Sequence, residues 1–223
     1  MDYSFSFFHV TQNLDKLVDG LWITLQLTVA ANLVGLTFGF VLSLLALSRF
    51  RAIRWPAQLY IEFFRCTPVL LQVIWFFYCL PILFDVYLSP ITMGVLALGL
   101  NLMAFNAEAY RAGIQAVPRD QMDACVALSL TPFQRTVYVV LPQAFRIALP
   151  VLITNGISIL QQSSLVAIVS VSDLMYEGKL LATDSYRPLE TYTVVALIYL
   201  AMALPVGQLV SWMERRQDKT LNT

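Results

Sequence analysis

Five long apolar runs are the feature that most limits what this chain can fold into. Each has about the length of 20 residues that an α-helix needs to cross a hydrocarbon layer of ~30 Å. Hydrophobic residues make up 58% of the 223 residues and charged residues only 13%, which is typical of membrane proteins. The sequence therefore predicts an all-α integral membrane protein. We expect a single domain over residues 1–223 with spans at about 20–47, 56–84, 90–110, 145–171 and 192–212.

The residues before the first span, 1–18, are aromatic and mildly acidic. They lack the basic start of a cleaved signal peptide, so we expect a short helix lying at the membrane interface. Within the first span, Gly35 and Gly39 form a GxxxG pattern. This pattern allows two helices to approach closely, and we interpret it as a packing contact.

The segment 111–144 is the longest polar interruption in the chain, and its punctuation predicts two short helices. Asp120 is an N-cap candidate for a helix through Leu128. Thr131-Pro132-Phe133-Gln134 has the residues of a capping box with proline in the first turn. We expect that second helix to reach Val140 and to end at Leu141-Pro142. The small residues Ala124, Cys125, Ala127 and Ser129 would let the first helix sink into a groove of a partner protein.

This segment resembles the signature loop of permease subunits of ATP-binding cassette (ABC) importers, which reads Glu-Ala-Ala, then Gly, then Ile-x-Leu-Pro. The matching residues are Asp123-Ala124-Cys125, Ser129 and Val139-Val140-Leu141-Pro142. Two further stretches, EFFRCTPVLLQ at 62–72 and EAYRAGI at 108–114, resemble the polar amino-acid branch of that family. The chain departs from the pattern where Asp123 replaces Glu, Cys125 replaces Ala and Ser129 replaces Gly. Asp120 also stands at a position where Gly is usual.

The resemblance implies the type I ABC importer permease fold in a bacterial cytoplasmic (inner) membrane. In that family the loop docks on a cytoplasmic ATP-binding subunit, so ATP and magnesium belong to that partner and this chain carries no cofactor. The resemblance also implies a second permease, identical or related, and an extracytoplasmic substrate-binding protein, with lipid around the spans. The residues expected to couple this chain to the ATPase are Asp120, Asp123, Ala124, Cys125, Ala127, Leu128, Ser129, Leu141 and Pro142.

Polar residues inside the apolar spans are candidates for a substrate path, because such groups are costly in lipid and usually face the protein interior. Thr67-Pro68 should break the second span, and a break at membrane depth indicates a bundle interior. The alternative for Glu62 and Arg65 is that they simply pair near the surface. The alternative for the amides is hydrogen bonding between helices. The candidates are Glu62, Arg65, Thr67, Pro68, Gln72, Asn101, Asn106, Glu108, Asn155, Gln161, Gln162, Ser163 and Ser164.

The distribution of Lys and Arg between the predicted loops indicates the orientation. One side holds ten of them, Arg49, Arg51, Arg54, Arg111, Arg119, Arg135, Arg146, Arg215, Arg216 and Lys219, while the other holds Lys16, Lys179 and Arg187. The positive-inside rule then places the N-terminus outside, and the 111–144 loop and the C-terminus in the cytoplasm. The outward loop 173–190 and the link near Asp85 are expected to meet the binding protein.

The sequence also argues against other function classes. It contains no GxxxxGK[ST] phosphate loop, so we expect no ATP hydrolysis on this chain. Its three cysteines and single histidine lack the spacing of a metal site, and its zero net charge does not suggest binding to nucleic acid. Two alternatives to the importer permease stay open, a self-contained channel or ion-coupled secondary carrier, and a membrane scaffold without transport. We find no internal repeat of the kind that carriers show.

Overall fold

The computed structural model describes residues 5–221, all of its regular structure being helical in that range. The helices are α1 (Phe8–Gln12), α2 (Leu14–Ala46), α3 (Arg51–Cys66), α4 (Val69–Ile74), α5 (Leu80–Phe84), α6 (Pro90–Gln115), α7 (Arg119–Ala127), α8 (Pro132–Gln134), α9 (Leu141–Gln162), α10 (Leu174–Ser185) and α11 (Pro188–Leu221). π-Helical turns at Trp75–Cys79 and Arg135–Val140 and a 3₁₀ helix at Ser163–Val169 join some of them.

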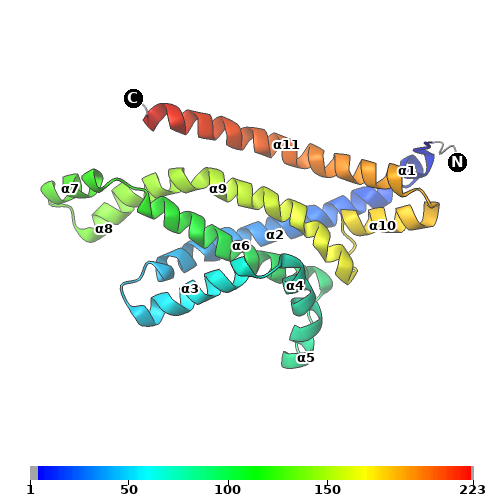
Figure 1. The fold of residues 1–223 in the computed structure, drawn as a ribbon, viewed down its shortest axis with the longest axis horizontal. Coiled ribbons are helices and arrows are strands. Elements are labelled where there is room, and N and C mark those ends of the chain that lie inside the picture. The colour runs from blue at the N-terminus through cyan, green and yellow to red at the C-terminus, as the bar shows by residue number, and fades with distance from the viewer. Residues whose placement is uncertain (1–4, 222–223) are drawn as a thin grey trace.

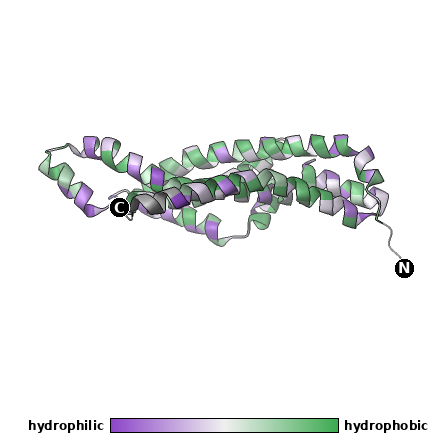
Figure 2. Cartoon of the chain, turned by 90° about the horizontal axis from the view of Figure 1, so that it is seen from above, coloured by the Kyte–Doolittle hydropathy of each residue, from purple (hydrophilic) through white to green (hydrophobic). Residues whose placement is uncertain are grey.

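Four helices of the described chain are long and apolar enough to cross a membrane, namely Leu14–Ala46, Pro90–Gln115, Pro132–Val169 and Pro188–Arg215. The number is five when the bent pair Arg51–Cys66 and Val69–Phe84 is counted as one crossing. The chain is therefore a multi-pass membrane protein. Hydrophobic residues dominate the middle of the elongated bundle, and hydrophilic residues are frequent towards its two ends (Figure 2).

The core lies where α2, α6 and α9 meet. Leu27 of α2, Leu98 and Leu102 of α6 and Ile159 of α9 are almost completely buried in one cluster. Gly35 confirms the predicted packing role, because a Cβ atom at this position would lie 2.4 Å from the Leu102 side chain. At Gly39 a Cβ would lie 2.9 Å from Cβ of Asn106. The GxxxG pattern thus holds α2 against α6 at close range.

The second predicted span is broken at Thr67-Pro68, as expected. Both residues are extended, and the helices on either side differ in direction by 106°. Figure 1 shows the segment Val69–Phe84 leaving the bundle at a steep angle while α3 stays packed along it. The expected second span, 56–84, thus consists of two parts on either side of this break, and the first part, α3, begins earlier than expected, at Arg51.

Leu141-Pro142 does not end a helix, which corrects the sequence prediction. The helix that starts at Pro132 continues through α9. The π-helical turn Arg135–Val140 immediately before Pro142 gives the reason. A proline ring collides with the carbonyl four residues earlier, and a wider turn with i→i+5 bonding moves that carbonyl to another partner.

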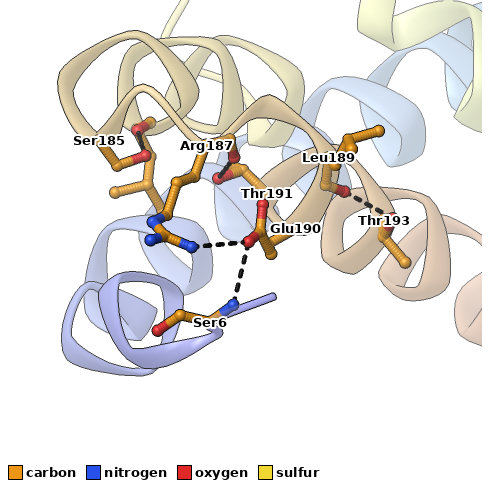
Figure 3. Close-up of polar contacts among 8 residues, drawn as sticks. Ser6, Ser185, Arg187, Leu189, Glu190, Thr191 and Thr193 are labelled. Atoms are coloured by element: carbon orange, nitrogen blue, oxygen red, sulfur yellow. Dashed lines mark hydrogen bonds and ion pairs between the residues drawn. The ribbon is translucent and has the colours of Figure 1, made fainter. Parts of the chain in front are cut away.

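The N-terminal end of the bundle also differs from the prediction. Residues 1–4 of the expected interfacial helix lie outside the described residues, and residues 14–18 belong to α2. The expected outward loop 173–190 contains a helix, α10, and α11 begins at Pro188. The buried carboxylate of Glu190 ties this end together, since it accepts hydrogen bonds from the Ser6 backbone and from Arg187, each at 3.0 Å (Figure 3).

Candidate functional site

The segment with α7 and α8 lies at the end of the bundle opposite α1 and α10 (Figure 1). Thr131 forms the predicted capping box, since its hydroxyl accepts from the Gln134 backbone at 3.3 Å while Gln134 Oε1 accepts from the Thr131 backbone at 3.0 Å. Asp120 is not the N-cap of α7. Pro118 takes that position in an extended conformation, and Asp120 lies in the first turn, where its charge still favours the helix N-terminus.

Ser129 ends α7 in a left-handed conformation with φ 55°. Its N–H donates to the Val126 carbonyl at 2.9 Å, and the N–H of Leu130 donates to the Cys125 carbonyl at 3.0 Å. These two bonds form a Schellman motif, which usually has glycine at this position because a Cβ is strained there. The departure from the family pattern at Ser129 therefore falls on the residue that must adopt a positive φ.

The first helix of the segment offers a continuous exposed surface. Its exposed residues include Asp120, Asp123, Ala124, Ala127, Leu128 and Ser129, whereas Cys125 is only 3% exposed and faces inward. Leu128 and Phe133 are each 73% exposed, and both lie in the polar segment 111–144. Exposed apolar side chains of this size among charged residues are typical of a surface that another protein covers.

The polar candidates within the bundle do not form one cluster. Gln72 and Asn101 hydrogen-bond to each other at the helix break, with Asn101 Nδ2 3.0 Å from Gln72 Oε1. Asn155 of α9 donates to Asn106 of α6 at 3.1 Å, a part-buried bond that joins the two helices. These pairs correspond to the alternative of hydrogen bonding between helices.

Glu108 is held between two arginines. Arg111, three residues later on the same helix, binds its carboxylate through two hydrogen bonds, and Arg65 of α3 lies 3.9 Å from the same carboxylate. Arg65 also lies over the Phe105 ring at 5.7 Å. The predicted alternative that Glu62 pairs with Arg65 is wrong, because the arginine turns towards α6 while Glu62 is exposed. The three-residue group carries a net positive charge.

The remaining candidates lie at the end of α9. Ser163 and Ser164 donate to carbonyls of the preceding turn, at Leu160 and Gln161 respectively. Gln162 Oε1 is buried and has no hydrogen-bond partner among the described residues. Gln161 lines a cavity of about 730 Å³ between α9 and α11, together with Gln208, Ser211 and Arg215. Sequence reasoning missed these three residues, although two polar side chains three apart near the end of an apolar run were a usable signal.

Sequence reasoning also missed a buried polar group at the α10 end. Asp173 is completely buried, caps α10 by accepting from the Tyr176 N–H at 2.9 Å, and accepts from the Tyr199 hydroxyl at 3.4 Å. Burial raises the pKa of the Asp173 carboxyl to about 6, against the opposing effect of the hydrogen bond from Tyr176. Thr24 of α2 completes this group by accepting from the Leu174 N–H at 3.1 Å.

Comparison with known proteins decides the family. A family model described as "Binding-protein-dependent transport system inner membrane component" matches residues 35–219. The chain belongs to this family. The glutamate/aspartate import permease protein GltK of Escherichia coli is 33% identical to this permease over 221 residues, which cover 96% of this chain and 99% of GltK. The probable glutamine ABC transporter permease protein GlnM of Bacillus subtilis is 32% identical over 208 residues, 93% of this chain and 96% of GlnM.

A solved structure supports the same assignment. The permease is similar to a chain of a crystal structure of an amino acid ABC transporter with histidines, at a TM-score of 0.89 and 33% identity. That match covers 96% of this permease and all of the other chain. The fold of this permease is therefore that of ABC transporter permeases, and its relatives are translocation subunits rather than catalytic ones. The family implies an ATPase and a binding protein as partners.

Proposed function

We propose that this chain is the membrane-spanning permease subunit of an ATP-driven importer for a polar amino acid in a bacterial cytoplasmic membrane. The observation that carries the proposal is the similarity over nearly the whole chain to permeases named for glutamate/aspartate and glutamine. ATP and magnesium are held by a partner ATPase, so this chain contributes the path and the mechanical connection.

The proposed orientation follows from charge. The α7–α8 end lies on the side with ten of the Lys and Arg residues, which is the cytoplasmic side by the positive-inside rule. The ATPase then contacts α7 and the residues just after it through exposed side chains, namely Asp120, Asp123, Ala124, Ala127, Leu128 and Ser129. Cys125 packs inward from α7, and Leu141 and Pro142 at the start of α9 help to position this segment. The binding protein contacts the opposite end, near α10 and Asp85. The bent pair Arg51–Cys66 and Val69–Phe84 counts as the fifth span.

The proposed substrate path runs along the cavity between α9 and α11. Gln161, Gln208 and Ser211 line this cavity with neutral hydrogen-bonding groups, beside Arg215. Amides and hydroxyls can bind the charged groups of an amino acid without bringing a second net charge into the membrane. The cavity is open on the outside of this chain, so we propose that a second permease, identical or related, completes it. Arg65 of α3 and Glu108 of α6 do not line this cavity and form a separate candidate group.

The coupling role is tested by reversing one charge on α7. Asp123→Lys should leave membrane insertion intact but separate ATP hydrolysis from uptake, because the exposed carboxylate lies on the surface proposed to contact the ATPase. Asp19→Lys makes the same change on an exposed residue of α2 at the other end, and coupled transport should persist. ATP hydrolysis and uptake are measured together on the complex in liposomes. Normal coupled uptake by Asp123→Lys would contradict the role of α7.

The assignment as an importer permease is tested by which proteins co-purify with the chain and by whether uptake requires ATP. The chain purified in mild detergent should bring with it an ATP-binding subunit, and uptake in liposomes should need that subunit, ATP and a binding protein. Substrate transport by this chain alone would instead favour a channel or carrier, and absence of both partners and transport would favour a scaffold.

A further inference from the structure

The break between α3 and α4 leaves one backbone acceptor without its helical donor. In a continuous helix the Phe64 carbonyl would accept from the N–H of residue 68, but that residue is Pro68, which has no N–H. Thr67 and Pro68 are extended, with ψ 142° and 132°, so the chain also turns away from the helix axis at this point. A carbonyl in the interior needs another partner, because an unpaired buried polar group is costly.

Two side-chain amides supply that partner. Gln72 Nε2 lies 3.0 Å from the Phe64 carbonyl oxygen, and Asn101 Nδ2 lies 3.1 Å from the same oxygen. The two donors occupy both acceptor positions of this carbonyl. Gln72 is 5% exposed and Asn101 is 1% exposed, so neither amide is free to exchange these bonds for bulk water.

Gln72 alone also reaches the other side of the break, where its two amide hydrogens are shared among the nearby acceptors. Gln72 Nε2 is 3.1 Å from the Thr67 carbonyl and 2.7 Å from the Thr67 hydroxyl oxygen. The hydroxyl in turn donates to the Phe63 carbonyl at 2.8 Å. Gln72 Oε1 accepts from Asn101, which closes the network between α3, α4 and α6. The polar groups released by the break are thus paired with protein groups on three helices.

We propose that Gln72 and Asn101 are positioning residues that fix the elbow between α3 and α4 and attach it to α6. Because Asn101 lies on α6, and α6 runs on to Gln115 just before α7, a displacement of α6 carries the arm Val69–Phe84 with it. Both side chains were substrate-path candidates, and their donor groups are instead committed to the break. The proposed movement of Val69–Phe84 with α6 rests on the proposed coupling role of α7. The attachment of the elbow to α6 by Gln72 and Asn101 does not depend on that role.

The elbow is tested by a distance across the break. Spin labels are placed at Leu59→Cys on α3 and Ile82→Cys on α5, which are 53% and 82% exposed. The background carries Cys66→Ser, Cys79→Ser and Cys125→Ala, since these are the cysteines of the chain. The full-length chain is measured with its associated ATPase in nanodiscs, diluted with unlabelled copies so that only distances within one chain are seen.

A single narrow distance distribution is expected for the unmodified network. Gln72→Leu and Asn101→Leu should each broaden the distribution or shift its maximum, because the arm loses its attachment. Gln58→Leu, the same kind of change on an exposed residue of α3, should leave it unaltered. Distributions for Gln72→Leu and Asn101→Leu that match the starting protein would overturn the proposal.

Restoring the backbone donor gives a second, independent test. Pro68→Ala provides an N–H that reaches the Phe64 carbonyl only if the helix becomes continuous. Adding Pro68→Ala to Gln72→Leu should therefore lengthen the label distance as the elbow straightens, whereas Pro68→Ala alone, with both amides in place, should leave the distance close to that of the starting protein. The same long distance with and without Gln72 would show that the amides do not hold the elbow. The labels report on the elbow without substrate or nucleotide, so failure of amino-acid uptake would refute the proposed function and leave this result intact.

Discussion

The buried Asp173 carboxyl predicts an unusual dependence of stability on pH. Burial raises the pKa of this group in the folded chain from its ordinary value of 3.8 to about 6. Between pH 4 and 6 the folded chain therefore binds a proton that the unfolded chain does not. Stability falls as pH rises through this window, and the cost of the buried charge is fully present above pH 6. A difference of about 2 pKa units corresponds to about 3 kcal/mol in the free energy of unfolding.

Asp173→Asn removes the charge and keeps an oxygen that can accept from the Tyr176 N–H. Asparagine is as good an N-cap as aspartate. The variant should therefore be more stable than the parent at pH 7.5, by up to about 3 kcal/mol, and should lose this advantage as pH falls to 4. Melting temperatures of the purified chain in detergent across this pH range provide the measurement.

Asp184→Asn is the matched control for the loss of one negative charge, because Asp184 is an exposed residue of the same helix. Its effect should be small and should not follow the same window. If Asp173→Asn proves less stable than the parent at every pH, the carboxylate stabilises α10 more than burial penalises it, and the reasoning is refuted.

Three further changes test other parts of the structure. Ser129→Gly should relieve the left-handed strain after α7 by about 1 kcal/mol and slow hydrogen exchange of the last α7 amides roughly fivefold; unchanged exchange would mean that no strain is stored there. Gly35→Ala should destabilise the α2–α6 contact by about 1–3 kcal/mol in thermal unfolding, because its Cβ meets Leu102, whereas Gly207→Ala, with no atom within 4 Å, should not; equal effects would refute the packing argument. Gln162→Ala should lower substrate-stimulated ATPase activity more than basal activity, by roughly tenfold if one hydrogen bond to a charged substrate group is lost, and equal losses would indicate a packing role.

Local chemistry carried the correct sequence predictions. The apolar runs placed the membrane helices because a spanning helix must satisfy its own backbone in lipid and show apolar side chains to it. Thr131 and Gln134 formed their capping box because both partners lie within one helical turn. Pro68 broke its helix because proline has no backbone N–H and because its ring disfavours the helical conformation of the preceding residue, Thr67.

Partners far apart in the sequence were beyond such rules. The sequence showed Arg65 three residues after Glu62, but the packing of α3 on α6 gave it Glu108 instead. From the sequence, Gln72 and Asn101 could equally be substrate ligands or form hydrogen bonds between helices. Only the fold shows that both amides donate to the Phe64 carbonyl. Pro142 lacks a backbone N–H just as Pro68 does, but its helix continues because the π-helical turn Arg135–Val140 makes room for the proline ring.

The sequence alone thus determined which segments are apolar and long enough to span a membrane and where local caps form, since those properties are set by neighbours within a few residues. The tertiary structure decided which polar side chains meet, which are used up in holding helices together and which stay open to a ligand. The physical reason is that a buried polar group takes whichever partner the packing brings within about 3 Å, and that distance depends on the whole arrangement of the helices.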